Sequence, residues 1–183
     1  MSDTKLRDLE RRWRETGTVE DEAAYLLERV RVGDVTRERL ELAAQCGHAA
    51  ARSTLVGNLP IVRDNPRKLA EALSEQFGRG AALRIVIALG EVLRGARQGG
   101  DEHVASALGV TRAALVKSSP NLDRLHGAWS DACGMDVLLR SAADHGAVLQ
   151  LLLHRIERLD LKAQALQAIR DRISRWALDG TEP

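Results

Sequence analysis

The sequence has few aromatic residues and only two cysteines. Aromatic residues make up 3% of the 183 residues, which leaves little for stacking on bases, sugars or flat cofactors. The cysteines, Cys46 and Cys133, have no metal-binding or redox spacing, so we expect two ordinary thiols in a reducing cytoplasm. The N-terminus lacks an apolar signal core, and the most apolar stretch, 83–93, is about half the length of a membrane span. These absences predict a soluble, cytoplasmic protein.

The sequence also lacks an excess of charge of one sign. It has 27 Lys and Arg against 26 Asp and Glu, a formal net charge of +1. Proteins that bind nucleic acids or anionic membranes through charge alone usually carry a clear basic excess. The small excess is local, since the net charge is +3 over 59–118 and −1 over each flanking segment. Any exception to electrostatic neutrality is therefore expected in the middle third of the chain.

Sequence motifs of catalysis and metal binding are absent. The sequence contains no G-x-S-x-G motif, no phosphate-binding loop and no H-E-x-x-H motif. Its five histidines form no i, i+4 pair, and Cys46-Gly47-His48 offers too few ligands for zinc. We therefore expect no catalytic residues, no metal and no cofactor, and a protein that is not an enzyme.

The residues that are abundant favour helices. Ala, Leu, Arg and Glu dominate, and runs of alternating β-branched residues are nearly absent. We predict an all-α fold, either an irregular multi-helix bundle or a short stack of helical pairs with a long C-terminal helix. The predicted helices cover about 4–16, 18–32, 36–47, 48–56, 65–77, 81–97, 101–108, 111–118, 121–132, 135–144 and 147–178, the last either continuous or bent near Asp160.

Helix boundaries in the first part of the chain are marked most clearly. Thr18 and Thr36 are predicted N-caps, and Gly17 and Gly33 end the preceding helices. We predict N-terminal helical pairs over 1–58 and a C-terminal helical bundle over 59–183, unless the two form one continuous domain.

A junction in the N-terminal part resembles a known repeat family. The segment ERLELAAQCGHAAARSTLVG, within 18–58, is similar to the helix–Gly–helix junctions of short helical repeats of the Sel1 and HEAT-like types. Its small side chains would allow close helix packing: Ala43, Ala44, Ala49, Ala50 and Ala51. The resemblance implies stacked helix pairs that present a surface to a protein partner. The alternative is an irregular bundle.

The helical surface favours the function of a non-enzymatic adaptor or regulatory module that binds another protein. Contact hot spots favour Trp, Tyr and Arg. The expected protein-binding residues are therefore Trp13, Tyr25, Arg29 and Arg39.

A second resemblance suggests DNA binding instead. The segment EHVASALGVTRAALVK, preceded by LGEVLRGARQGG, resembles the helix-turn-helix of lambda-repressor-like domains over 83–122. The resemblance implies a turn at Gly109, with Thr111 capping a recognition helix. It also implies three DNA-binding residues, Thr111, Arg112 and Lys117. The alternative is a structural turn that does not read DNA.

The C-terminal segment carries apolar residues spaced by seven. These residues are Leu152, Leu159, Leu166 and Ile173. The spacing is typical of a coiled-coil seam, although neighbouring apolar residues widen the stripe. Segment 147–178 is thus expected either to pack on the protein's own body or to form a homodimer.

Overall fold

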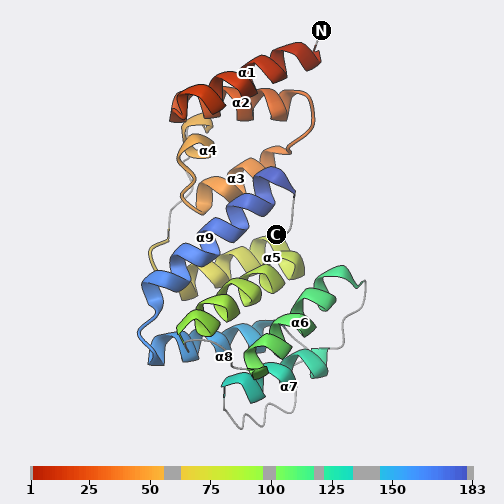
Figure 1. The fold of residues 1–183 in the computed structure, drawn as a ribbon, viewed down its shortest axis with the longest axis vertical. Coiled ribbons are helices and arrows are strands. Elements are labelled where there is room, and N and C mark those ends of the chain that lie inside the picture. Colours follow the sequence, from red (N-terminus) through yellow and green to blue (C-terminus); the bar gives the residue numbers. More distant parts are fainter. Residues whose placement is uncertain (1, 56–62, 97–101, 118–121, 134–144, 181–183) are drawn as a thin grey trace. The chain divides into compact units, whose positions relative to one another are not determined.

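The structure is a computed structural model, and it describes residues 2–55, 63–96, 102–117, 122–133 and 145–180 (Figure 1). Within these ranges the chain forms helices and no strand, which confirms the predicted all-α class. In chain order the helices are α1 (Ser2–Thr16), α2 (Val19–Arg31), α3 (Arg37–Gln45), α4 (Ala49–Thr54), α5 (Pro66–Ala96), α6 (Glu102–Val116), α7 (Leu122–Cys133), α8 (His145–Arg158) and α9 (Lys162–Asp179). The helix predicted over 135–144 lies outside the described residues.

The chain divides into two compact units. Unit 1 comprises Met1–Arg63 together with Ile173–Pro183, and unit 2 comprises Asp64–Arg172. The division therefore falls within α9. Residues 173–183 group with the N-terminal helices by their contacts, whereas the sequence-based division groups them with the rest of the C-terminal part.

Unit 1 is built from short helices with the predicted caps. The hydroxyl oxygens of Thr18 and Thr36 accept hydrogen bonds from backbone N–H groups in the first turns of α2 and α3, which confirms both N-caps. Gly33, which follows α2, has a φ of +81°, a conformation that other residues adopt only with strain. Within this unit α2 packs against α1 and α4, and α4 also packs against α3.

Small side chains form much of the unit 1 core. Ala43, Ala44, Ala50 and Ala51 are completely buried, as the close packing of α3 and α4 requires, whereas Ala49 is exposed. The predicted close packing is thus confirmed at four of the five alanines. The resemblance to helical repeats itself stays a prediction.

Unit 2 is organised around the second half of α5. This helix is interrupted at Gly78 (φ 66°, ψ −154°), where the sequence predicts a break, because its backbone leaves the helical region there. The run from Ala81 to Gly90 is buried except at Arg84. In Figure 1 α6 and α8 lie along α5, and α7 lies beside α6.

The prediction of two helices within 101–118 is wrong. Residues Glu102–Val116 form one continuous helix, α6, with no turn at Gly109. Thr111 does not cap a helix, because its hydroxyl lies mid-helix, donating to the Ala107 carbonyl (2.8 Å) and accepting from Nε1 of Trp129 (2.9 Å). A glycine inside a helix lowers stability by only about 1 kcal/mol relative to alanine. The buried contacts of Thr111 therefore outweigh the preference of Gly109 for a turn.

The C-terminal segment bends where the sequence allows a bend. Helices α8 and α9 are separated near Asp160, which has a φ of +53°. Leu152 and Ile173, two members of the seven-residue spacing, are completely buried, while Leu159 at the bend is 38% exposed. The spacing therefore does not form one uninterrupted seam, and its buried members contribute to the chain's own core. The homodimer through 147–178 stays a prediction.

Candidate functional site

Three of the predicted protein-binding residues come together in unit 1. The rings of Trp13 and Tyr25 stack with centroids 5.4 Å apart and an interplanar angle of 17°. The Arg29 guanidinium carbon lies 5.5 Å from the Tyr25 ring centroid, in cation–π range. Both rings are half-buried. The cluster joins α1 to α2, so its first role is to hold this helix pair together.

Arg29 and Arg39 are also engaged inside unit 1. Arg29 Nε lies 2.6 Å from Oδ2 of Asp34, and only 12% of its side chain is exposed. Arg39 Nη2 donates to the Trp176 carbonyl near the end of α9, at 2.5 Å. Sequence reasoning identified residues that stabilise unit 1, and their contact with a partner stays a prediction.

Two buried carboxylates of α2 were not singled out from the sequence. Asp21 accepts from the hydroxyls of Thr16 (2.6 Å) and Thr18 (3.0 Å). The Thr16 hydrogen bond is the main cause that holds the Asp21 pKa below its ordinary value, despite desolvation. In the sequence, the position of Asp21 three residues after the N-cap Thr18 could have indicated its hydrogen bond to this threonine. The burial of Asp21 could not be predicted in this way, because it depends on the packing of α1.

Glu28 is the second of these carboxylates. It lies 2.5 Å from Arg31 Nη2 and 3.0 Å from Lys5 Nζ, and its side chain is 4% exposed. The hydrogen bonds from Arg31, followed by that from Lys5, lower its pKa from 4.5 to about 2. Like Asp21, it is held ionised by an intramolecular partner and is a structural group.

The three predicted DNA-binding residues do not share one accessible face. Thr111 is completely buried, so its assignment as a DNA contact is wrong. Arg112 is exposed, and its Nη2 lies 3.1 Å from the Glu91 carboxylate, which also accepts from Arg172 at 2.8 Å. Lys117 is exposed just beyond the end of α6.

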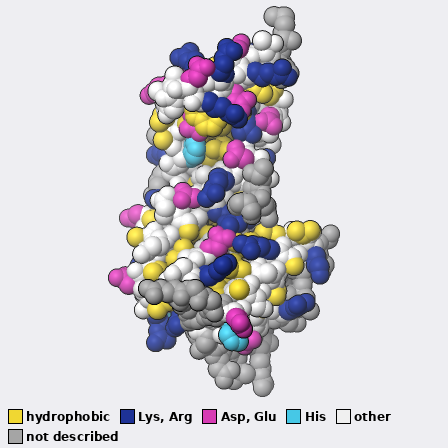
Figure 2. Space-filling model, viewed as in Figure 1, with side chains coloured by type: hydrophobic (Ala, Val, Ile, Leu, Met, Phe, Trp, Pro, Cys, Tyr) yellow, Lys and Arg dark blue, Asp and Glu magenta, His cyan; other side chains and the backbone are white. Residues whose placement is uncertain are grey.

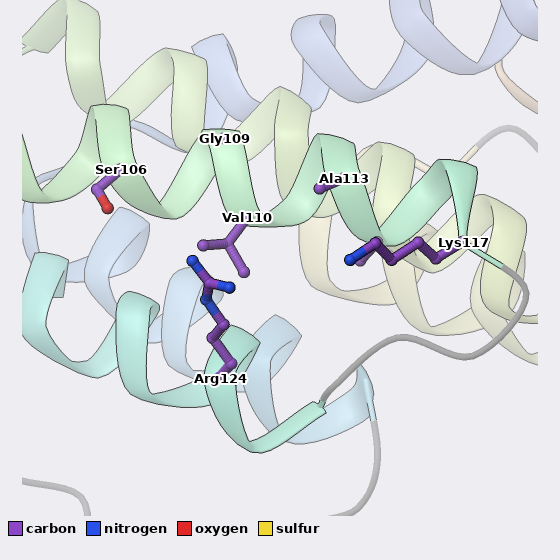
Figure 3. Close-up of a pocket in the computed structure, with 7 residues that line it drawn as sticks. Ser106, Gly109, Val110, Ala113, Lys117 and Arg124 are labelled. Carbon is purple, nitrogen blue, oxygen red and sulfur yellow. The ribbon is translucent and has the colours of Figure 1, made fainter.

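Lys117 lines a groove between α6 and α7 that the sequence did not reveal (Figure 3). The groove has a volume of about 280 Å³. We call it the α6–α7 groove, and its lining residues are Ser106, Gly109, Val110, Ala113, Ala114, Lys117 and Arg124. Its floor is apolar with small side chains, and Gly109 and Ala113 are exposed, so the groove is open to a partner.

Two cationic side chains reach into this groove from different helices. Figure 3 shows Arg124 extending from α7 toward Val110, and Lys117 extending along α6 toward Ala113. No residue of its described lining is acidic. The groove therefore combines an apolar floor with positive charge.

The end of α6 is held by a side chain of α5. A helix C-terminus carries partial negative charge on its free carbonyl groups. Arg79 Nη2 donates to the carbonyls of Ala114 and Lys117, each at 2.6 Å. The Arg79 guanidinium of α5 thus satisfies two carbonyl groups at the end of α6 and ties this end to α5.

The surface of unit 1 differs from this groove. On the face shown in Figure 2, basic side chains (dark blue) alternate with acidic ones (magenta) over α1. Within α1, ion pairs such as Arg11–Asp8 (2.9 Å) and Arg14–Glu10 (2.6 Å) bring opposite charges together. On this face α1 therefore carries charges of both signs.

The described residues also bear on metal binding and on membrane spanning. In the part of the chain that the structure describes, no group of three or more His, Cys, Asp or Glu side chains could hold a metal ion. Over the same residues no helix is both long and apolar enough to cross a membrane.

Comparisons with known proteins add no relative. Models of known protein families, curated protein sequences and solved structures each give no match to this chain. The two resemblances noted from the sequence therefore stay predictions, and function must be argued from the geometry alone.

Proposed function

We propose that this protein is a non-enzymatic binding module and that the α6–α7 groove receives a segment of a protein partner. The observation that carries the proposal is the combination of an open floor of small apolar residues with two cationic side chains, Lys117 and Arg124. Small floor residues let a partner backbone approach closely, and the cations supply orientation. We place this module in the cytoplasm, in keeping with the buried thiols of Cys46 and Cys133.

The dimensions of the groove favour a peptide segment. Pockets for small molecules span roughly 300–1,000 Å³ and bury most of their ligand. At about 280 Å³, with exposed residues in its lining, this groove suits one or two side chains of a larger partner. Its described lining includes Ser106 but neither a histidine nor a carboxylate that could activate the hydroxyl, which favours binding over catalysis.

DNA binding is less well supported by the same residues. Helix α6 is unbroken, Thr111 is buried, and the Arg112 charge is shared with Glu91. Phosphate backbones need several accessible cations on one face, and an apolar floor offers them nothing. The proposal is therefore a protein partner.

A groove-filling variant tests the proposal. A displayed library of random peptides would be selected on the full chain, and the enriched peptides assayed on Ala113→Trp and on Ala105→Trp. Both alanines are exposed on α6, but only Ala113 lines the groove. We expect Ala113→Trp to weaken binding by about tenfold or more, a loss of about 1.4 kcal/mol, and Ala105→Trp to leave it unchanged.

Two outcomes would overturn the proposal. One is a selection that enriches no peptide above the level seen on Ala113→Trp. The other is a set of enriched peptides that bind the two tryptophan variants equally, which would place their site outside the groove.

A further inference from the structure

We infer that the exposed side of α6 binds the same side of a second copy of this chain, with the two α6 helices antiparallel. The inference goes beyond the proposed function, because it names a second surface and commits to one occupant, α6 of the second copy. This surface differs from segment 147–178, for which the sequence predicts a homodimer.

Helix α6 buries one side and leaves the opposite side uncovered. The buried residues are Val104, Ala107, Leu108, Thr111 and Ala114. The opposite side, which we call the outer face of α6, consists of exposed residues spaced as one side of a helix requires: Glu102, Ala105, Ser106, Gly109, Arg112, Ala113, Val116 and Lys117. Val116 is 85% exposed, more than any other large apolar side chain that the structure describes, so covering it is favourable.

The two ends of the outer face carry opposite charges. Glu102 lies in the first turn of α6, and Lys117 follows its last turn. Within the described part of the chain, neither of these two side chains forms a hydrogen bond or an ion pair. The outer face therefore begins with an uncompensated negative charge and ends with an uncompensated positive one.

An antiparallel second copy brings these opposite charges together. Gly109 is close to the middle of the segment from Glu102 to Lys117. When two α6 helices cross at Gly109 with two-fold symmetry, Glu102 of each copy faces Lys117 of the other, and both pairs form at once. A parallel arrangement would place like charges opposite each other, which is unfavourable. The charges thus make the outer face complementary to itself in the antiparallel orientation alone.

The side chains near the crossing point are small enough for close contact. Ala105 and Ala113 lie four residues to either side of Gly109, and all three are exposed. The space above Gly109 is open, because no atom lies within 4 Å of a Cβ added there. In the antiparallel pair, Ala105 of one copy lies opposite Ala113 of the other. The helix axes can therefore approach to about 8 Å, at the short end of the usual range.

The length of α6 indicates the strength of this contact. A helix of 15 residues is about 22 Å long, and the contact involves one such helix from each copy. Its area is smaller than the roughly 1,200–2,000 Å² that stable complexes bury. We therefore expect a weak, reversible dimer that forms at chain concentrations on the order of 100 µM.

Reversing the two charges tests the pairing. Sedimentation equilibrium of the full chain would be measured for wild type, Glu102→Lys, Lys117→Glu and an equimolar mixture of the two variants. Each variant alone places like charges opposite each other, whereas the mixture again pairs opposite charges at both ends. The matched controls are Glu20→Lys and Lys68→Glu, which change the net charge equally at exposed residues outside α6.

We expect wild type to dimerise as its concentration rises. Each charge reversal should weaken the dimer about tenfold, and the mixture should return to within about threefold of wild type. The controls should stay within about twofold of wild type. Raising the salt from about 50 mM to about 300 mM should weaken the wild-type dimer, because exposed charges are screened. Recovery in the mixture also shows that both variants fold.

Three results would overturn the inference. The first is a wild type that stays monomeric at concentrations on the order of 1 mM, well above the expected midpoint. The second is a dimer that both charge reversals leave unchanged. The third is a mixture that dimerises no better than either variant alone.

Ala105→Trp separates the inference from the proposed function. Ala105 lies on the outer face of α6 but does not line the α6–α7 groove. The variant should therefore lose the dimer and keep the binding of selected peptides, titrated at concentrations where the chain is monomeric. If it dimerises like wild type, the inference fails and the groove remains a peptide site. If it loses the dimer while Ala113→Trp keeps peptide binding, the proposed function fails and the inference stands.

Discussion

Units 1 and 2 use different interactions to hold their helices together. In unit 1 the side chains that join α1 to α2 are charged or aromatic, and Asp21 and Glu28 are buried acids with basic partners. In unit 2 the second half of α5 is apolar on nearly every side, and Trp129 packs against it, completely buried. Coulombic contacts depend on pH and salt, whereas apolar packing depends on shape. The two units should therefore respond to different perturbations.

The comparison of the two units also bears on the proposed binding site. In unit 1, charged side chains form ion pairs with one another, as Glu28 does with Lys5 and Arg31. In unit 2, Lys117 and Arg124 line a groove whose floor is formed by small apolar residues. A rigid apolar scaffold supports this groove, which suits a binding surface that must keep its shape.

The largest effect is expected from Trp129→Ala. The substitution leaves a cavity beside α5 and removes the hydrogen bond to Thr111, so it should lower the free energy of unfolding of unit 2 by about 3–5 kcal/mol. Trp13→Ala, at a half-buried ring of unit 1, should cost only about 1–2 kcal/mol. Hydrogen exchange followed by mass spectrometry measures the stability of each unit separately. Equal losses from the two substitutions would contradict the comparison.

A smaller effect is expected from Gly90→Ala. An added Cβ would overlap Cη2 of Trp129 and lie 2.9 Å from Cδ2 of Leu108, so unit 2 should lose about 1–3 kcal/mol despite the better helix propensity of alanine. Gly109→Ala is the matched control, because no atom lies within 4 Å of its added Cβ. It should stabilise α6 by up to about 1 kcal/mol. Thermal unfolding shows whether each variant is more or less stable than wild type. Destabilisation by Gly109→Ala would show that α6 is not a regular helix at this residue.

Local signals predicted several helix boundaries in both units well. Threonine caps, glycine ends and the break at Gly78 depend on residues that are adjacent in sequence, and the structure has them where they were expected. The turn at Gly109 was predicted from the same kind of signal and is absent, because Trp129, eighteen residues beyond Thr111, holds that threonine inside a helix. A contact at such a separation leaves no trace in the local pattern.

The candidate groove could be predicted only in part. Lys117 was singled out as a DNA-binding residue implied by the helix-turn-helix resemblance. Arg124 was not singled out, since its approach to α6 depends on how α7 packs. Trp13, Tyr25 and Arg29 were chosen by residue type, and the structure uses them to join α1 and α2. Residue type alone does not distinguish a side chain that binds a partner from one that packs inside the protein.

Acid should affect unit 1 more than unit 2. The pKa of Glu28 is lowered from 4.5 to about 2 by its hydrogen bonds from Arg31 and Lys5, so its ionised form stabilises the folded state. This contribution is fully present above pH 4.5 and is lost as the pH falls toward about 2. Glu28→Gln should therefore be less stable than wild type at neutral pH, and the difference should shrink over that interval.

Glu20→Gln is the control for this pH dependence, because Glu20 is exposed on the same helix. Urea unfolding at several pH values, with hydrogen exchange to assign each unit, gives the measurement. A difference between wild type and Glu28→Gln that stays constant from pH 7 to about pH 2 would show that the ionisation of Glu28 does not stabilise unit 1.

The smallest effect is expected from Arg39→Met, which tests how charge holds the last turn of α9 within unit 1. Arg39 Nη2 donates to the Trp176 carbonyl at 2.5 Å, and the variant keeps an apolar stem while removing this hydrogen bond. We expect the free energy of unfolding of unit 1 to fall by about 1 kcal/mol, which is the contribution expected of one half-buried hydrogen bond to the backbone. Arg37→Met, at an exposed residue paired with Glu41, should cost less than about 0.5 kcal/mol. Faster exchange in the last turn of α9 in Arg39→Met alone would show that unit 1 depends on this single cation. Equal exchange in the two variants would mean that apolar burial of Ile173 and Ala177 is sufficient to hold the turn.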